Sequence, residues 1–193
     1  MTKEILSAIA LALTFIAFVP YIRSIIDGAT RPHVFSWFIW TGGTFAVFLA
    51  QLSDGAGVGA WPIGVSAGLT LIVALLALRH QADKSITGSD WLFLALGLLG
   101  LVLWVATSSP LYAVILLTIV DLSGFGPSIR KGWHLPHEED PLFFSIAIVR
   151  NGVVIAALEH YSWTTILFPA AVGIACILFV AFILIRRRQI TAN

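Results

Sequence analysis

Pro20-Tyr21-Ile22-Arg23 returns 107 residues later as Pro127-Ser128-Ile129-Arg130, and this repeated stretch decides the fold of the 193-residue chain. Each copy lies at the end of a long apolar segment and combines a proline with an arginine. A motif that recurs at a fixed offset predicts a duplicated structural unit. The chain is therefore expected to contain two copies of one helical unit.

Further motif pairs extend the repeat beyond this stretch, towards the C-terminus. The pairs keep the same order in both halves, and each pair occupies the same end of an apolar segment. They are Pro32-His33-Val34-Phe35-Ser36 with Pro141-Leu142-Phe143-Phe144-Ser145, at an offset of 109, and Trp61-Pro62 with Phe168-Pro169, again at 107.

The composition places both copies in a membrane. Hydrophobic residues make up 59% of the chain and charged residues 11%, with a mean hydropathy of +0.95, which is too apolar for a soluble domain of this size. A helix needs roughly 20 residues to cross a hydrocarbon core of about 30 Å. Seven spans of about that length are predicted: Ile5–Ile22, Val34–Leu52, Trp61–Leu78, Trp91–Thr107, Leu111–Ser128, Leu142–Leu158 and Trp163–Ile185.

The positions of the basic residues predict the orientation. Of eleven lysines and arginines, nine fall on one side of the predicted spans, whereas Lys3 lies on the other side and Arg150 lies inside a span. The side rich in lysine and arginine is the cytoplasmic one. The N-terminus is thus expected outside and the C-terminus in the cytoplasm of a multi-pass cell-membrane protein, with a bacterial inner membrane as the expected location.

The fold class follows as an all-α membrane protein with two parallel three-helix repeats. A unit of three spans ends on the opposite side from its start, so the span Trp91–Thr107 is needed to make the two copies parallel. The expected domains are residues 1–79, the linker helix within 80–110, and residues 111–193 with a basic tail. The first span is expected to be a retained helix, because no small-residue cleavage site follows it.

This arrangement of three helices, a linker helix and three helices resembles the SWEET and PQ-loop superfamily of small-solute transporters. In the PQ-loop signature a glutamine follows the first proline of each copy, where this chain has Tyr21 and Ser128. The resemblance implies alternating access and a substrate such as a sugar, a vitamin precursor or an amino-acid-like solute. It also implies a gating role for four prolines, which are Pro20, Pro32, Pro127 and Pro141.

Independent of that resemblance, proline chemistry gives the same residues two interpretations. Pro20 and Pro127 stand inside predicted spans, where a missing N–H weakens the helix and favours a hinge. Pro32 and Pro141 begin spans, which is a favourable position for proline without any gating role. Gating and simple helix initiation both remain open for this second pair.

Asp121 and Arg150 are charged residues inside predicted spans. An unpaired charge at the centre of a membrane costs at least about 2.5–3.5 kcal/mol, so each charge is expected to be the other's partner. One interpretation has them lining a central cavity, with Asp121 binding a solute or coupling it to a proton; the other is a buried structural ion pair. The corresponding residues of the first copy are Thr14 and Thr41.

Other polar and aromatic residues near these charges are secondary candidates. Asn151 follows Arg150 and is expected either to pack helices or to line the cavity. Trp37 and Trp40 lie one helical turn apart, so they are expected either to stack on a solute or to anchor the helix at the interface. Glu159 and His160 suit an outer gate or ordinary interfacial polarity.

The loop from His134 to Asp140 contains two histidines and three carboxylates. It lacks the spacing of a known metal motif, and a solvated loop is the expected structure. No metal and no cofactor are predicted. The one cysteine, Cys176, cannot form an intramolecular disulfide and is expected to be a packing residue.

Two functions remain open at this stage: a transporter of a small polar solute, and a non-transporting scaffold, receptor or assembly subunit. No enzyme is expected, because neither a G-x-S-x-G nor an H-E-x-x-H motif occurs, and the last span lacks a lysine for a retinal Schiff base. The expected partners are membrane lipid and a small-molecule substrate, without nucleic acid. A homo-oligomer is compatible with the sequence.

Overall fold

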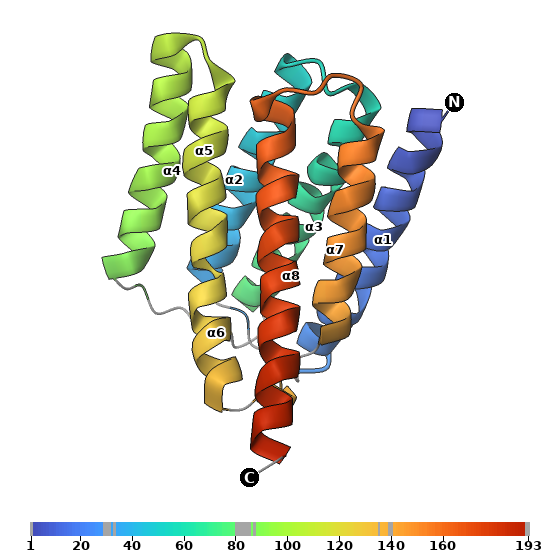
Figure 1. The fold of residues 1–193 in the computed structure, drawn as a ribbon. Coiled ribbons are helices and arrows are strands. Elements are labelled where there is room, and N and C mark those ends of the chain that lie inside the picture. The colour runs from blue at the N-terminus through green and yellow to red at the C-terminus, as the bar shows by residue number, and fades with distance from the viewer. Residues whose placement is uncertain are drawn as a thin grey trace.

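The computed structural model describes residues 2–28, 32, 34–79, 86, 88–134, 136–138 and 141–191. Within these ranges the structure is helical, and no strand occurs (Figure 1). Five helices there are long and apolar enough to cross a membrane. They are α1 (Thr2–Ile26), α2 (Val34–Ser53), α3 (Trp61–Arg79, preceded by the 3-10 turn η1, Gly57–Ala60), α4 (Gly88–Thr107) and α8 (Trp163–Thr191).

Two predicted spans fall on shorter apolar helices, α5 (Pro110–Ser123) and α7 (Pro141–Ala157). They have 14 and 17 residues, fewer than the roughly 20 that a straight crossing needs. The remaining described elements are α6 (Phe125–His134) and the short 3-10 turn η2 (Pro136–Glu138).

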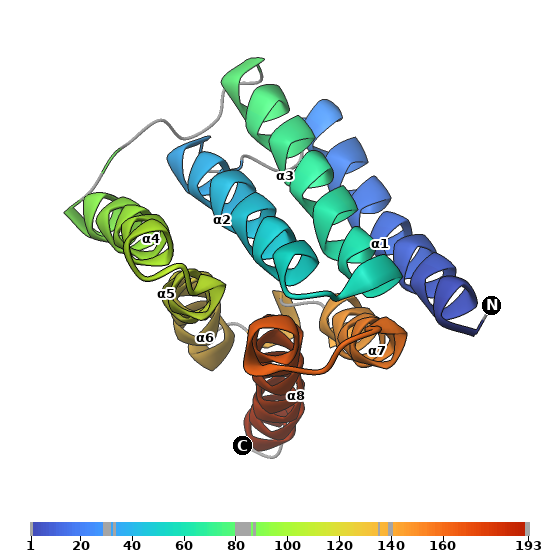
Figure 2. The ribbon, with the colours of Figure 1, turned by 90° about the horizontal axis from the view of Figure 1, so that it is seen from above.

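The helices pack in two sets of three, seen along their axes in Figure 2. In the first unit α3 lies between α1 and α2, and in the second unit α8 lies between α5 and α7. The units meet where α1 packs against α7 and where α2 packs against α5. Helix α4 packs on α5 and also contacts α2, so it is attached to the place where the units join.

Small side chains make up much of the buried interior. Eight of the described alanines, including Ala10, Ala60 and Ala113, are fully buried. Small residues allow helices to approach closely, which is how helices associate in lipid. Large apolar side chains lie instead on the outside, such as Val105 at 83% exposure and Leu142 at 66%, as expected for a surface facing hydrocarbon.

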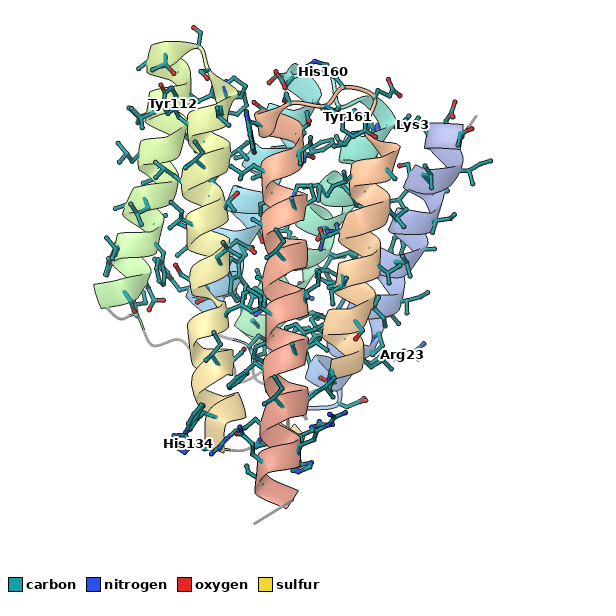
Figure 3. The ribbon with its side chains drawn as sticks, viewed as in Figure 1. Lys3, Arg23, Tyr112, His134, His160 and Tyr161 are labelled. Carbon is teal, nitrogen blue, oxygen red and sulfur yellow. The ribbon has the colours of Figure 1, made fainter. Side chains whose placement is uncertain are left out.

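The two termini lie at opposite ends of the bundle (Figure 1). We call these the N-terminal end and the C-terminal end of the bundle. Lys3, His160 and Tyr161 lie at the N-terminal end, whereas Arg23 and His134 lie towards the C-terminal end (Figure 3). Helices α1, α3 and α8 all carry arginine in their last turn.

The predicted span Leu111–Ser128 was wrong as one continuous helix. Helix α5 ends at Ser123, and α6 begins at Phe125 after a turn at Gly124. The Gly124 amide bonds the backbone oxygen of Asp121, three residues back, at 3.0 Å. A β-carbon at Gly124 would lie 2.9 Å from Cζ2 of Trp40, so the indole on α2 occupies the space beside the turn.

Helices α1 and α8 both continue through an internal proline. Pro20 lies inside α1, which extends to Ile26 rather than to the predicted Ile22. Pro169 lies inside α8, which extends past the predicted end at Ile185. Neighbouring turns therefore keep helical geometry around a missing backbone donor, and a proline there lowers the cost of bending rather than breaking the helix.

Candidate functional site

Arg150 lies in the middle of α7 and joins this helix to two helices of the first unit. Its Nε donates to Oγ1 of Thr14 on α1 at 3.2 Å, and one terminal nitrogen donates to the backbone oxygen of Pro62 on α3 at 2.9 Å. The other terminal nitrogen donates to Oδ1 of Asn151 at 3.3 Å. All three acceptors are neutral, so the guanidinium is hydrogen-bonded but its charge is not cancelled by a direct contact.

Hydrogen bonds within α1 and α7 orient the acceptor side chains Thr14 and Asn151. Thr14 is 2% exposed and donates its hydroxyl to the backbone oxygen of Ala10 at 2.8 Å, which leaves lone pairs for Arg150. Asn151 donates its amide to the backbone oxygen of Ala147 at 2.9 Å, so its Oδ1 is free to turn to the guanidinium. Thr14 and Asn151 are thus positioned by their own helices to accept from Arg150.

Asp121 lies on α5 and faces a small cavity between α2, α5 and α8. The space open to the centre of a water-sized sphere is about 10 Å³, which is room for about one water molecule. Asp121 supplies the one charged side chain of the cavity wall. The other residues of the wall are Ile39, Trp40, Gly43, Thr44, Leu117, Val120 and Phe168.

A direct ion pair between Asp121 and Arg150 was expected and is not formed. No nitrogen of Arg150 lies within 4.0 Å of the Asp121 carboxylate. The reason is the direction of each side chain: Arg150 extends to oxygens of α1 and α3, whereas Asp121 faces α2 and α8. The two charges still interact through space, but Arg150 does not line the Asp121 cavity.

The Asp121 carboxylate has no hydrogen-bond donor among the residues that the structure describes. This is costly inside an apolar helix bundle, where charged groups are normally paired. This half-buried carboxylate therefore has no structural partner in that part of the chain.

A row of aromatic rings runs from α1 to this cavity. Tyr21 on α1 packs against Trp37 on α2 with ring centroids 5.3 Å apart, and Trp37 contacts Trp40 edge to face, also at 5.3 Å. Trp40 lines the cavity itself, whereas Trp37 supports it from one turn away. Thr41 donates its hydroxyl to the backbone oxygen of Trp37 at 2.7 Å, within the same helix.

The four candidate prolines occupy different settings. Pro20 is exposed within α1, Pro32 is buried just before α2, and Pro141 is the first residue of α7. Pro127 lies within α6, and its side chain is outside the described part of the structure. The loop from His134 to Asp140 also lies partly outside the described residues.

At the N-terminal end, the segment 54–60 of the first unit is hydrogen-bonded to the segment 156–165 of the second unit; we call this contact the end lock. Ser162 Oγ donates to the Asp54 carboxylate, and His160 Nδ1 lies 2.8 Å from the backbone oxygen of Asp54. The Glu159 amide donates to the backbone oxygen of Ala56 at 3.1 Å. The Glu159 carboxylate accepts in return from the amide of Val58 at 3.2 Å.

Helices on either side extend the end lock. Lys3 on α1 donates to the backbone oxygen of Ala156 at 2.6 Å and to the Tyr161 hydroxyl at 3.0 Å (Figure 3). Gln51 at the end of α2 is fully buried and donates to the backbone oxygen of Thr165 at 2.8 Å. Several hydrogen bonds therefore hold the two units together at this end.

Sequence reasoning identified Glu159 and His160 but missed Asp54 and Ser162. A lone aspartate and a lone serine in two loops more than 100 residues apart give no local pattern. The alignment of the repeats could have helped, because it matches the loop between α2 and α3, which carries Asp54, with the loop between α7 and α8, which carries Ser162.

No protein-family model, characterised protein or solved structure matches this chain. The resemblance to the SWEET and PQ-loop superfamily therefore stays a prediction that depends on the repeat and the prolines.

Proposed function

We propose that this chain is an integral membrane transporter that moves a small polar solute between its two helical units by alternating access. The observation that carries the proposal is the carboxylate of Asp121, which faces a small cavity at the contact between α2 and α5 and has no donor among the described residues. Intramembrane carboxylates in such positions serve solute or proton pathways.

The packing of the helices supports a duplicated, two-unit transporter. The order α1, α3, α2 in one unit corresponds to α5, α8, α7 in the other, and the contact of α1 with α7 corresponds to that of α5 with α2. In this proposal residues 1–79 and 111–193 are the repeats, residues 80–110 hold the linker helix, and all seven predicted spans cross the membrane. Two like units around a central site are the common architecture for alternating access.

The end lock supports alternating access, because it holds the two units together in a state that is closed at the N-terminal end of the bundle. Its hydrogen bonds connect the two units at the N-terminal end, which the positive-inside rule places outside. The cavity has room for about one water molecule, so a solute enters only after the units separate. Opening requires these hydrogen bonds to break and the α1 and α7 contact to shift.

Uptake into liposomes tests the proposal. The purified chain is reconstituted, a set of radiolabelled sugars, amino acids and vitamin precursors is offered, and uptake is measured with and without an inward proton gradient. Asp121→Asn is expected to lower the initial rate by about tenfold or more, because removal of one buried ionised partner typically costs that much. Asp27→Asn, at an exposed carboxylate beyond the end of α1, is the matched control and is expected to leave uptake unchanged.

Two results would contradict this function. Absence of uptake for every solute, by a reconstituted protein that melts cooperatively, would favour the non-transporting scaffold. Equal uptake by the wild type and Asp121→Asn would remove Asp121 from the transport path. An Asp121→Asn variant that transports but no longer responds to the proton gradient would assign Asp121 to proton coupling.

A further inference from the structure

We propose that, when the two units separate, the cavity beside Asp121 receives the ammonium group of a small organic solute, held between the Asp121 carboxylate and the Trp40 indole. This inference rests on the proposed function, because it names the class of solute that the transporter would carry.

The first step is charge. Asp121 is the one ionisable residue of the cavity wall, and no donor among the described residues reaches its carboxylate. Arg150, the nearest candidate to neutralise it, is held by Thr14, Pro62 and Asn151. A positively charged group in the cavity would supply the missing partner at short range.

The second step is the aromatic wall. Trp40 lines the same cavity, and its Cζ2 lies 2.9 Å from where a β-carbon of Gly124 would be, one helical turn after Asp121. The indole is therefore packed against the same stretch of α5 as the carboxylate. A carboxylate and an indole that line one cavity can together bind an ammonium group, through ionic attraction to the first and cation–π attraction to the second.

The third step is the shortage of other polar groups. Besides Asp121, the wall offers the hydroxyl of Thr44 and the N–H of Trp40, while its remaining side chains are apolar or absent. A sugar carries many hydroxyl groups, most of which would be left without partners against this wall. A compact ammonium group needs one counter-charge and apolar contacts, and the wall provides both.

The close packing of α2 against α5 brings Trp40 and Asp121 to the same cavity. A β-carbon at Gly43 would lie 3.3 Å from Cδ2 of Leu117, so glycine at this position allows the two helices to approach. Trp40 is thereby brought close to α5, with Trp37 packed against it edge to face and Tyr21 packed against Trp37.

The test is calorimetric titration of the full-length protein in detergent with three probes of similar shape. Choline is a cation, betaine carries the same trimethylammonium group with a carboxylate, and 3,3-dimethylbutan-1-ol is the neutral isostere of choline. Choline, betaine or both are expected to bind, with the neutral alcohol weaker by about tenfold or more. A preference for betaine that disappears in Arg150→Gln would place the carboxylate of the solute towards Arg150 and supports the inference.

Variants locate the binding. Asp121→Asn is expected to weaken binding of the favoured probe by about tenfold or more, and Trp40→Leu by about fivefold. Asp27→Asn and Trp163→Leu, at an exposed carboxylate and a 73% exposed indole, are the controls and are expected to bind as the wild type does. The comparison of the three probes on the wild-type protein tests the inference even if a variant fails to fold.

The outcomes separate this inference from the proposed function. Equal binding of the neutral alcohol, binding that Asp121→Asn leaves unchanged, or binding of sodium ion alone would overturn the ammonium site. Uptake of a neutral solute without binding of any ammonium probe would overturn it too and leave transport standing. Binding of choline or betaine that depends on Asp121, with no movement across liposomes, would uphold the site and contradict the transporter.

Discussion

The Nε of Arg150 donates to Oγ1 of Thr14 at 3.2 Å, so a half-buried guanidinium on α7 is hydrogen-bonded to a threonine on α1. By the repeat, Thr14 occupies in the first unit the position that Asp121 occupies in the second. The second unit thus supplies the charge and the first unit supplies a neutral acceptor.

Thr14→Val is expected to destabilise the protein by about 1.5–3 kcal/mol, the usual cost of losing a hydrogen bond to a charged group. Valine has nearly the shape of threonine, so packing is kept while the acceptor is removed. The measurement is the midpoint of thermal unfolding in detergent. Thr41→Val is the control, because its hydroxyl bonds within its own helix.

A double-mutant cycle with Thr14→Val and Arg150→Met isolates the interaction free energy between these two side chains from their contacts with other residues. The expected coupling energy is about 1 kcal/mol, within the range for residues in direct contact. Additive effects of the two substitutions would show that the hydrogen bond contributes nothing to the contact between α1 and α7.

Gly124→Ala is expected to destabilise the protein by about 1–3 kcal/mol, because the new methyl group would lie 2.9 Å from Trp40 and force the indole to move. The same change at Gly126 is a matched control on the following helix, where a β-carbon would meet nothing within 4 Å. Gly126→Ala should raise stability by up to about 1 kcal/mol through helix propensity. Equal melting of both variants would mean that the turn at Gly124 does not depend on Trp40.

The sequence predicted where the apolar helices lie because hydrophobic length and basic flanks are local signals. Helices α2 and α4 end at or next to the predicted boundaries. The break at Gly124 was not predictable, because it coincides with the approach of Trp40 from a helix about 80 residues earlier in the chain. Apolar periodicity within Leu111–Ser128 gave no sign of that contact.

The candidate site was predicted in part. The cost of a charge inside the membrane predicted Asp121 as the partner of Arg150, whereas Arg150 is hydrogen-bonded to Thr14 and Asn151, which the sequence offered only as separate site candidates. Its bond to the backbone oxygen of Pro62 had no sequence signal, since every residue carries such an oxygen. The assumption that opposite charges pair directly was wrong, because distance and side-chain direction are properties of the packed helices.

The end lock is expected to open more easily in Ser162→Ala. This substitution removes the hydroxyl that donates to the Asp54 carboxylate, a bond to a charged group worth about 1.5–3 kcal/mol. Hydrogen exchange reports the opening: the Glu159 amide, bonded to the backbone oxygen of Ala56, should exchange faster by about tenfold or more. Ser53→Ala is the control, because Ser53 bonds only to Ala50 in its own helix. Unchanged exchange at Glu159 would show that the segments are held together without Ser162.

Gly59→Ala should separate the two units at the same end by a different route. A β-carbon at Gly59 would lie 2.6 Å from both the backbone nitrogen and the Cα of Leu158, and a backbone cannot yield as a flexible side chain can. The segments 54–60 and 156–165 must then move apart, so we expect a loss of about 3 kcal/mol, at the upper end of the usual overpacking cost. Gly68→Ala on α3, where a β-carbon meets nothing within 4 Å, should melt at or above the wild-type temperature because alanine has the higher helix propensity.

If the transporter works by separating these segments, Gly59→Ala should still bind the substrate. Its rate of solute transport into liposomes should differ from that of the wild type. A variant that melts early yet transports at the wild-type rate would show that the end lock stabilises the fold without gating it.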